Sequence, residues 1–348
     1  MKILYYLLVL VPVAIVLEIV GAGHTLIFVT SAIALVPLAG LLGDATEQVA
    51  VHTGPRVGGL LNATFGNAAE LIITIVAIQR GLVELAKASI SGSIIGNILL
   101  VLGASLLAGG LKNGRQFFNA HIASVTATMM TLSVVALLIP ALFSIGPNQV
   151  SANHTENLSI GVAIVLLLLY ALFVLYTIFL QPADGAGGET HAKDGARGIW
   201  FSLGLLVATT VAVVAMSEVL IRNVEPVIES WGISELFLGV ILIPIIGNVA
   251  EHFVAVTTAY RNQMDLSIGI AIGSSLQVAL FVAPVLVFVS LLLGNKMTLV
   301  FNEYELAALV GAVAVATFIS MDGESNWLEG AQLLAVYIIV GLGFFYLS

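Results

Sequence analysis

Two nearly identical pentapeptides, Gly66-Asn67-Ala68-Ala69-Glu70 and Gly247-Asn248-Val249-Ala250-Glu251, lie 181 positions apart in this chain (247 minus 66). Each places one acid inside an apolar run long enough to cross a bilayer. A carboxylate at the centre of a membrane helix costs roughly 2.5 to 3.5 kcal/mol on insertion scales, so something must offset it. A single acid of this kind can be protonated or bonded to a buried hydroxyl. Two acids in matching pentapeptides favour a cation held between them.

The composition is that of a membrane protein. The 348 residues are 59% hydrophobic and 9% charged, whereas soluble domains have about 25% charged residues. Apolar runs of helical length recur from end to end, which predicts an all-α integral membrane protein. Because the chain has no cysteine, disulfides and Cys-ligated metal are excluded. The net charge of −9 gives no reason to expect nucleic acid as a partner, and we expect the lipid bilayer to surround the chain.

Eleven transmembrane helices are predicted. They cover approximately residues 3–20, 25–43 and beyond, 57–78, 85–108, 122–143, 158–180, 200–221, 234–260, 266–293, 303–320 and 328–347. A Pro-containing, glycine-rich segment of mixed charge at 181–198 divides them and reads as a linker. The predicted organisation is a leading helix in residues 1–23, a five-helix repeat in 24–180, the linker, and a second five-helix repeat in 199–348.

One register relates the two repeats. The offset of 181 also aligns Arg80 with Arg261, and Gly92-Ser93 with Gly273-Ser274. Biased composition explains matched Val and Leu, but not matched polar residues at fixed spacing. Five helices per repeat is an odd number, so the second repeat enters from the opposite side. The topology is therefore predicted to be inverted, with a binding site near the midplane.

Orientation and location follow from the flanking sequence. A modest excess of Lys and Arg on the N-terminal side places the N-terminus and the linker in the cytosol. The first apolar run lacks a clear cleavage site, so we expect a retained first span. The short predicted ends, without a targeting sequence, favour the plasma membrane of a prokaryote.

The two pentapeptides offer only oxygen ligands. On a helix, residues three and four apart share a face, which groups Gly66, Asn67 and Glu70, and likewise Gly247, Asn248 and Glu251. Glycine weakens a helix, and an unwound turn at either glycine would free backbone carbonyls as ligands. In the second copy, Pro244 would release a further carbonyl, although a packing kink is an equally good explanation.

Such an oxygen cage favours calcium as the transported ion. Calcium takes six to eight oxygen ligands, zinc prefers nitrogen and sulfur, and magnesium gives up its water reluctantly. Two acids balance one divalent charge. When the ion leaves, two close carboxylates repel each other and take up protons. Ions and protons would therefore compete for Glu70 and Glu251, which is a mechanism for exchange.

A second group of polar residues lies on the neighbouring predicted helices. Ser93 and Asn97 share one face, and Ser274 and Gln277 share another. Each residue alone is typical of a hydrogen bond between membrane helices. Because the two pairs lie at matched or nearly matched positions of the repeats, we expect them to line the ion pathway.

Three further residues are candidates for ion access or proton transfer. Glu47 and Glu218 each follow a hydroxyl residue near the end of a repeat's first helix. They fit an access path or, equally, a solvated interface. His252 can carry protons near neutral pH, although on a helix it points about 100 degrees away from Glu251.

Signatures of several other protein classes are missing. The chain has no Gly-x-x-x-x-Gly-Lys phosphate loop, no His-Glu-x-x-His and no Gly-x-Ser-x-Gly. An ATP-driven pump, a membrane metalloprotease and a serine hydrolase are therefore disfavoured. We expect neither an enzyme nor a bound cofactor.

The motifs together resemble the calcium/proton exchangers, the CAX branch of the calcium/cation antiporter superfamily. The resemblance rests on residues 44–47, 53–55, 58–72, 247–252 and 273–277. It implies eleven helices with the first outside the repeats, calcium held by Glu70 and Glu251, and calcium export or sequestration driven by inward proton flow. Many members have an acidic segment between the halves, and residues 181–198 depart from this with three acids against two bases.

The sequence therefore predicts a secondary antiporter that exchanges cytosolic calcium for protons by alternating access. A sodium-coupled calcium exchanger of the same superfamily is the nearest alternative, although the alanines and valine within the pentapeptides add no neutral oxygens for sodium. A passive cation channel, with the acids as a selectivity ring, is a third possibility.

Overall fold

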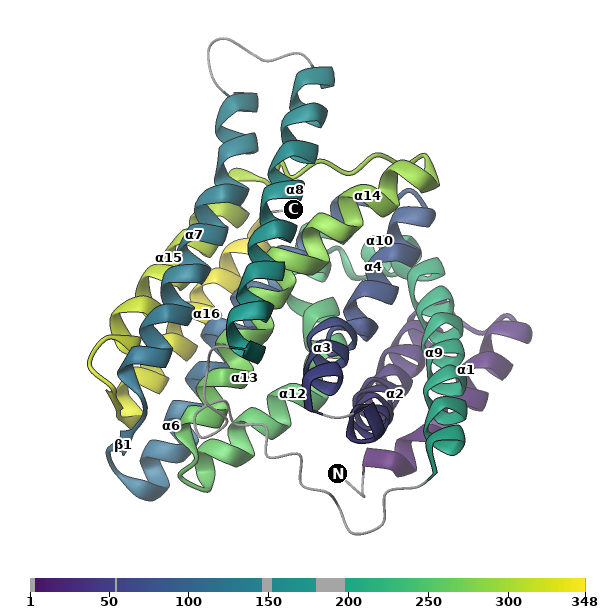
Figure 1. Ribbon diagram of the computed structural model, residues 1–348. Helices are drawn as coiled ribbons and strands as arrows, with labels where there is room; N and C mark the ends of the chain where they lie inside the picture. The colour runs from purple at the N-terminus through teal and green to yellow at the C-terminus, as the bar shows by residue number, and fades with distance from the viewer. Residues whose placement is uncertain (1–3, 54, 146–151, 180–197, 348) are drawn as a thin grey trace.

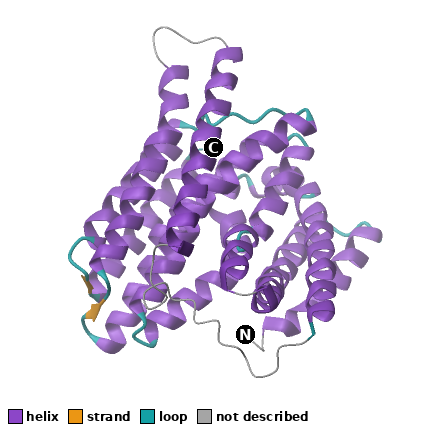
Figure 2. Cartoon of the chain, in the orientation of Figure 1, coloured by secondary structure: helices purple, strands orange, loops and turns teal. Residues whose placement is uncertain are grey.

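The computed structural model describes residues 4–53, 55–145, 152–179 and 198–347. Helices make up nearly all of it, and two short strands pair at one end of the bundle (Figure 2). The predicted linker at 181–198 lies, apart from Gly198, outside the described residues. An all-helical chain is what a bilayer requires, because a helix satisfies its backbone hydrogen bonds internally.

In the described part of the first half, the structure has eleven elements. They are η1 (Leu4–Val9), α1 (Leu10–Ile19), α2 (His24–Thr53), α3 (Pro55–Phe65), α4 (Ala68–Gln79), α5 (Val83–Ile95), η2 (Gly96–Val101), α6 (Leu102–Asn113), β1 (Gln116–Phe117), α7 (Ala120–Ile145) and α8 (Ala152–Phe179).

Another eleven follow in the second half. They are α9 (Ile199–Arg222), α10 (Val224–Trp231), α11 (Glu235–Phe237), η3 (Leu238–Leu242), α12 (Ile243–Tyr260), α13 (Met264–Gln277), η4 (Val278–Val282), α14 (Ala283–Leu293), α15 (Glu303–Ser320), β2 (Glu324–Ser325) and α16 (Trp327–Tyr346).

Nine helical stretches of the described chain are long and apolar enough to cross a membrane. Of two shorter apolar helices, Tyr5–Ile19 matches the predicted span at 3–20, whereas Ala68–Gln79 covers only the second half of the predicted span at 57–78, which the structure divides into α3 and α4. The chain is thus an integral membrane protein with several spans. The count of eleven and the inverted repeats stay predictions.

The helices that carry the polar motifs lie between two outer groups. On one side α2 and α9 pack against each other, with α1 against both (Figure 1). On the other side α7 packs with α15, and α16 packs with α6. Exposed apolar side chains such as Leu168, Leu172 and Val211 cover α8 and α9, as expected of surfaces that face lipid. Of the nine long stretches, Val83–Asn113 is the most enclosed, with 72% of an 18-residue apolar segment within it buried.

Within the residues that the structure describes, three π-helical segments interrupt the central helices. They are η2, η3 and η4, and η2 and η4 begin 182 residues apart (278 minus 96). A π-helical turn widens the helix and disturbs the regular hydrogen-bond ladder, and it is frequent at functional sites. Both η2 and η4 begin next to predicted pathway residues, Asn97 and Gln277.

Some elements were not predicted from the sequence. The short helix α10 follows α9, and β1 pairs antiparallel with β2 through Gln116 opposite Ser325. Pairs of two-residue strands are too short to produce a periodic pattern. They join the turn after α6 to the turn before α16.

Candidate functional site

The first pentapeptide lies at a break between two helices. Helix α3 ends at Phe65 and α4 begins at Ala68, with Asn67 outside the helical region at φ −97° and ψ 24°. The predicted weakening at Gly66 therefore occurs. Glu70 follows in the first turn of α4 and is 5% exposed.

The second pentapeptide lies inside a continuous helix, so the predicted unwinding at Gly247 is wrong. Helix α12 runs from Ile243 to Tyr260, with Pro244 in its first turn. Because α12 continues directly from η3 in one helical run, Glu235–Tyr260, the missing N–H of Pro244 falls just after the π-helical turn, where the hydrogen-bond ladder is already disturbed. A Cβ at Gly247 would lie 3.3 Å from Cγ of Glu70. The glycine thus gives the opposing acid room, instead of breaking the helix.

Hydrogen bonds join Glu70 to the other half of the chain. Nδ2 of Asn248 donates to Oε1 of Glu70, and the hydroxyl of Ser93 lies near the same carboxylate. Oε2 of Glu70 is buried without a hydrogen-bond partner among the described residues. A carboxylate oxygen in that condition is costly unless a cation or a proton satisfies it.

Glu251 is linked back to the first half through Ser274. Oγ of Ser274 lies 2.8 Å from Oε2 of Glu251 and 3.1 Å from Oδ1 of Asn67, so its one proton serves one of them at a time. Nδ2 of Asn67 donates to Oε1 of Gln277 at 2.5 Å. Glu70 and Glu251 are close enough to interact electrostatically. These side chains therefore form one polar cluster. We call it the ion cluster, and it consists of Asn67, Glu70, Asn248, Glu251, Ser274 and Gln277.

His252 and Asn97 form a separate contact beside this cluster. Nε2 of His252 lies 3.2 Å from Oδ1 of Asn97. Nδ2 of Asn97 is buried without a hydrogen-bond partner among the described residues. No described hydrogen bond links this pair to the two glutamates.

Glu218 and Glu47, the two acids predicted to line an access path, have no described contact with the ion cluster. Glu218 forms ion pairs with Arg80 and with Arg222, and Arg222 also reaches Glu18 at 3.1 Å. Glu47 is exposed on α2. Their role in an access path stays a prediction.

Helix crossings on the two sides of the ion cluster differ, a feature that the sequence analysis missed. A Cβ at Gly92 of α5 would overlap backbone atoms of Val240 in η3, and one at Gly239 would lie 2.5 Å from Cβ of Ala88. At the matched position, Gly273 of α13 has no atom within 4 Å of a Cβ, and Gly58 of α3 packs on Ala50 of α2 instead. The α5–η3 crossing is therefore closed, and the corresponding α13–α3 crossing is open.

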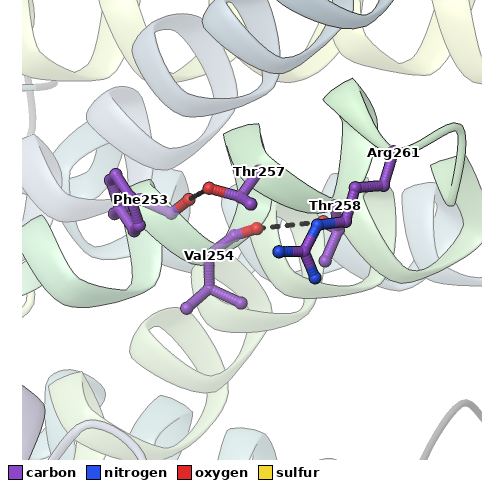
Figure 3. Close-up of a pocket in the computed structure, with 5 residues that line it drawn as sticks. All are labelled: Phe253, Val254, Thr257, Thr258 and Arg261. Carbon is purple, nitrogen blue, oxygen red and sulfur yellow. Dashed lines mark hydrogen bonds between the residues drawn. The ribbon is translucent and has the colours of Figure 1, made fainter. Parts of the chain in front are cut away.

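A hollow of about 240 Å³ lies farther along α12 (Figure 3). Phe253, Val254, Thr257, Thr258 and Arg261 line it. It contains no acid and carries one cation, so it does not resemble a cation site. The ion cluster is the better candidate.

The ion cluster can hold a hard cation without a permanent metal centre. Two carboxylates, the amides of Asn67 and Asn248, and the hydroxyl of Ser274 lie together, and these oxygens match calcium. Across the described residues, no group of three or more His, Cys, Asp or Glu gathers as a metal site. Two acids and neutral oxygens suit an ion that binds and leaves.

Comparison with known proteins gives a consistent set of matches. The family model described as sodium/calcium exchanger protein matches residues 23–179 and 201–346. A Ca(2+)/H(+) antiporter of Aphanothece halophytica is 43% identical over 359 residues, covering 99% of this chain and 96% of that protein. The Ca(2+)/H(+) antiporter ChaA of Bacillus subtilis (strain 168) is 42% identical over 343 residues, covering 97% of each. The solved structure of native YfkE has a TM-score of 0.86 at 40% identity and covers 99% of both chains.

Proposed function

The chain belongs to the sodium/calcium exchanger protein family, and on this premise we propose that it is a transporter exchanging calcium for protons across the membrane. Its similarity to two bacterial proteins named Ca(2+)/H(+) antiporters supports this choice of ions. Membership of the family makes it a transporter and not an enzyme. Calcium is the cargo, and the bacterial plasma membrane is the expected location.

The observation that carries the proposal is the meeting of Glu70 and Glu251 in one polar cluster. The acids come from sequence positions far apart, and Asn248 bridges them by bonding to Glu70 from the same helix as Glu251. A divalent cation bound between the two carboxylates would balance their two negative charges. Without the ion, the unpartnered oxygen of Glu70 favours a proton. Binding of calcium and binding of protons are then alternatives at one site.

Neutral side chains tune this exchange. In the structure, Asn248 and Ser274 offer N–H and O–H donors to the two carboxylates. Donors of this kind stabilise a carboxylate that has lost its ion. When calcium binds, the amide oxygens of Asn67 and Asn248 can act as further ligands after their side chains rotate. These residues therefore adapt the cluster to either state.

The difference between the two helix crossings supports alternating access. Glycines hold α5 and η3 together on one side of the cluster, and the matched crossing of α13 and α3 is open. In the predicted orientation, with the N-terminus inside, the open side faces the cytosol. Transport would then require the closed and open crossings to exchange roles.

Calcium uptake into proteoliposomes tests the proposal. With an outward-directed proton gradient across the vesicle membrane and no sodium, uptake should occur and should collapse when a protonophore removes the gradient. Raising the proton concentration on the calcium side should raise the calcium concentration needed for half-maximal uptake, because protons occupy the same acids. Uptake that requires a sodium gradient would establish sodium coupling, and uptake that ignores both gradients would indicate a channel.

A further inference from the structure

Glu305 is a buried acid that the exchange reaction does not use. It lies in the first turn of α15 and is 1% exposed. Side chains of this type are almost never fully buried unless they are paired. Both of its oxygens have partners: Oε2 accepts from the backbone N–H of Asn302 at 2.8 Å, and Oε1 accepts from Oγ of Ser91 at 2.5 Å.

Capping of the N-terminus of α15 explains the bond from Asn302 to Glu305, but not the bond from Ser91. Asn302 and Glu305 form a capping box, in which each side chain bonds the other's backbone. A capping box needs no burial and no partner on another helix. Ser91 is on α5, it is 0% exposed, and its hydroxyl reaches Glu305 from the interior of the span. The second bond therefore joins α15 to α5.

Ser91 begins a tripeptide that contacts three elements at once. Ser91 bonds Glu305 of α15, Gly92 packs on the backbone of Val240 in η3, and Ser93 lies near Glu70 of α4. Successive helical residues point about 100 degrees apart, so three neighbours can reach three partners. Through Ser93 the tripeptide borders the ion cluster, and through Gly92 it forms the α5 side of the closed α5–η3 crossing.

The positively charged neighbour of this bond is also on α5. Lys87 lies one turn before Ser91, is 7% exposed, and pairs with Glu84 at 2.8 Å. Lys87 and Glu84 both interact electrostatically with Glu305. The second half of the chain has no counterpart to the bond between Ser91 and Glu305, since Ile272 occupies the position 181 residues after Ser91 (272 minus 91).

We propose that Glu305 is a positioning residue for calcium transport: by holding Ser91, it fixes the α5 wall of the ion cluster and keeps the α5–η3 crossing closed. The proposal rests on the function proposed above. It assigns to Glu305 a role beyond capping α15, although Glu305 itself does not contact the ion.

Single substitutions separate the two roles of Glu305. Ser91→Ala removes the bond between helices, together with the contact of the same hydroxyl with the carbonyl of Ala88 in its own helix at 3.0 Å, and leaves the capping box intact. Its matched control is Ser133→Ala, which removes another fully buried serine that bonds only within its own helix, to the carbonyl of Met129. We expect Ser91→Ala to raise the calcium concentration for half-maximal uptake by about fivefold, because α5 no longer holds Ser93 in place. Ser133→Ala should leave it unchanged.

A double-mutant cycle with Glu305→Ala, which removes both oxygens, completes the test. If Ser91 acts only through Glu305, the double variant should match Glu305→Ala alone in its half-maximal calcium concentration, so the effects will not add. A Ser91→Ala protein that transports like Ser133→Ala, or effects that add in the double variant, would overturn the proposal. Thermal midpoints measured on the same samples show whether folding is disturbed. Wild-type vesicles that fail to take up calcium would instead overturn the proposed function, and this inference with it.

Discussion

Gly92 and Gly273 lie at matched positions of two similar sequence segments, and their surroundings are opposite. Gly92 is pressed against the backbone of Val240, and Gly273 faces open space. The same contrast extends to the two pentapeptides, because the first lies at a helix break and the second lies within α12. Similar sequences therefore adopt different packing in one molecule, and the difference falls on the two sides of the ion cluster.

This difference teaches that matched sequence positions can be packed in two ways, and the proposed alternating access would use both packings at each crossing. Small residues let helices approach closely without further chemistry, so under the proposed mechanism each crossing would close when its partner helix approaches. The acids lie between the crossings and belong to both. The following predictions test how far the two halves are equivalent, from the largest expected effect to the smallest.

Removing the charge of either acid should abolish exchange. Glu70→Gln and Glu251→Gln each leave one carboxylate, which cannot balance a divalent ion, so gradient-driven calcium uptake should fall by at least about 100-fold. Glu303→Gln, at an exposed acid of α15, is the control. Normal uptake by either site variant would show that the halves do not share the ion.

The two glycines should respond differently to a methyl group. Gly92→Ala should destabilise the protein by about 1–3 kcal/mol, because its Cβ meets backbone that cannot move cheaply. Gly273→Ala should leave the thermal midpoint unchanged or slightly raised, since glycine is the weaker helix former.

Transport by Gly273→Ala then tests the second state that the proposed alternating access requires. If the α13–α3 crossing must close during each cycle, uptake should fall by about tenfold while the fold stays intact. Unchanged uptake would mean that this crossing never closes.

The two asparagines should also differ. Asn248 bonds Glu70 directly, whereas Asn67 reaches Glu251 only through Ser274. We expect Asn248→Ala to raise the half-maximal calcium concentration by about tenfold and Asn67→Ala by about threefold. Calcium titrations of uptake measure both, and a larger effect at Asn67 would reverse this assignment.

The smallest effect is expected at Glu47, which is exposed on α2. As an acid along an access path it would attract cations, so Glu47→Gln should lower the uptake rate by no more than about threefold. The loss should disappear at high salt, which screens exposed charges. Glu156→Gln, which removes an acid paired with Lys296, controls for the loss of charge alone.

Much of the fold was predictable because membrane helices have a strong signal. Long apolar runs gave helices close to the observed ones, and the repeated pentapeptides identified the residues that the structure brings together. Glycine predicted the break at Gly66, where α3 has ended and α4 has not yet begun.

The remaining features depend on contacts between distant segments. Gly247 carries the same local signal as Gly66, yet it serves the close approach of Glu70. The π-helical segments and the bond between Ser91 and Glu305 also have no local signature beyond the capping pattern Asn302-x-x-Glu305. Such features appear only when the helices are packed, since each one requires a partner more than a hundred residues away or a distortion set by its neighbours.

The central claim is that calcium and protons occupy the same two acids. Titration calorimetry of the purified protein with calcium, repeated in buffers of different ionisation enthalpy, counts the protons released for each ion bound. We predict that calcium binding releases protons, that the number increases as the pH is lowered, and that Glu70→Gln loses both the binding and the release. Calcium binding of unchanged strength with no proton release at any pH would contradict the account.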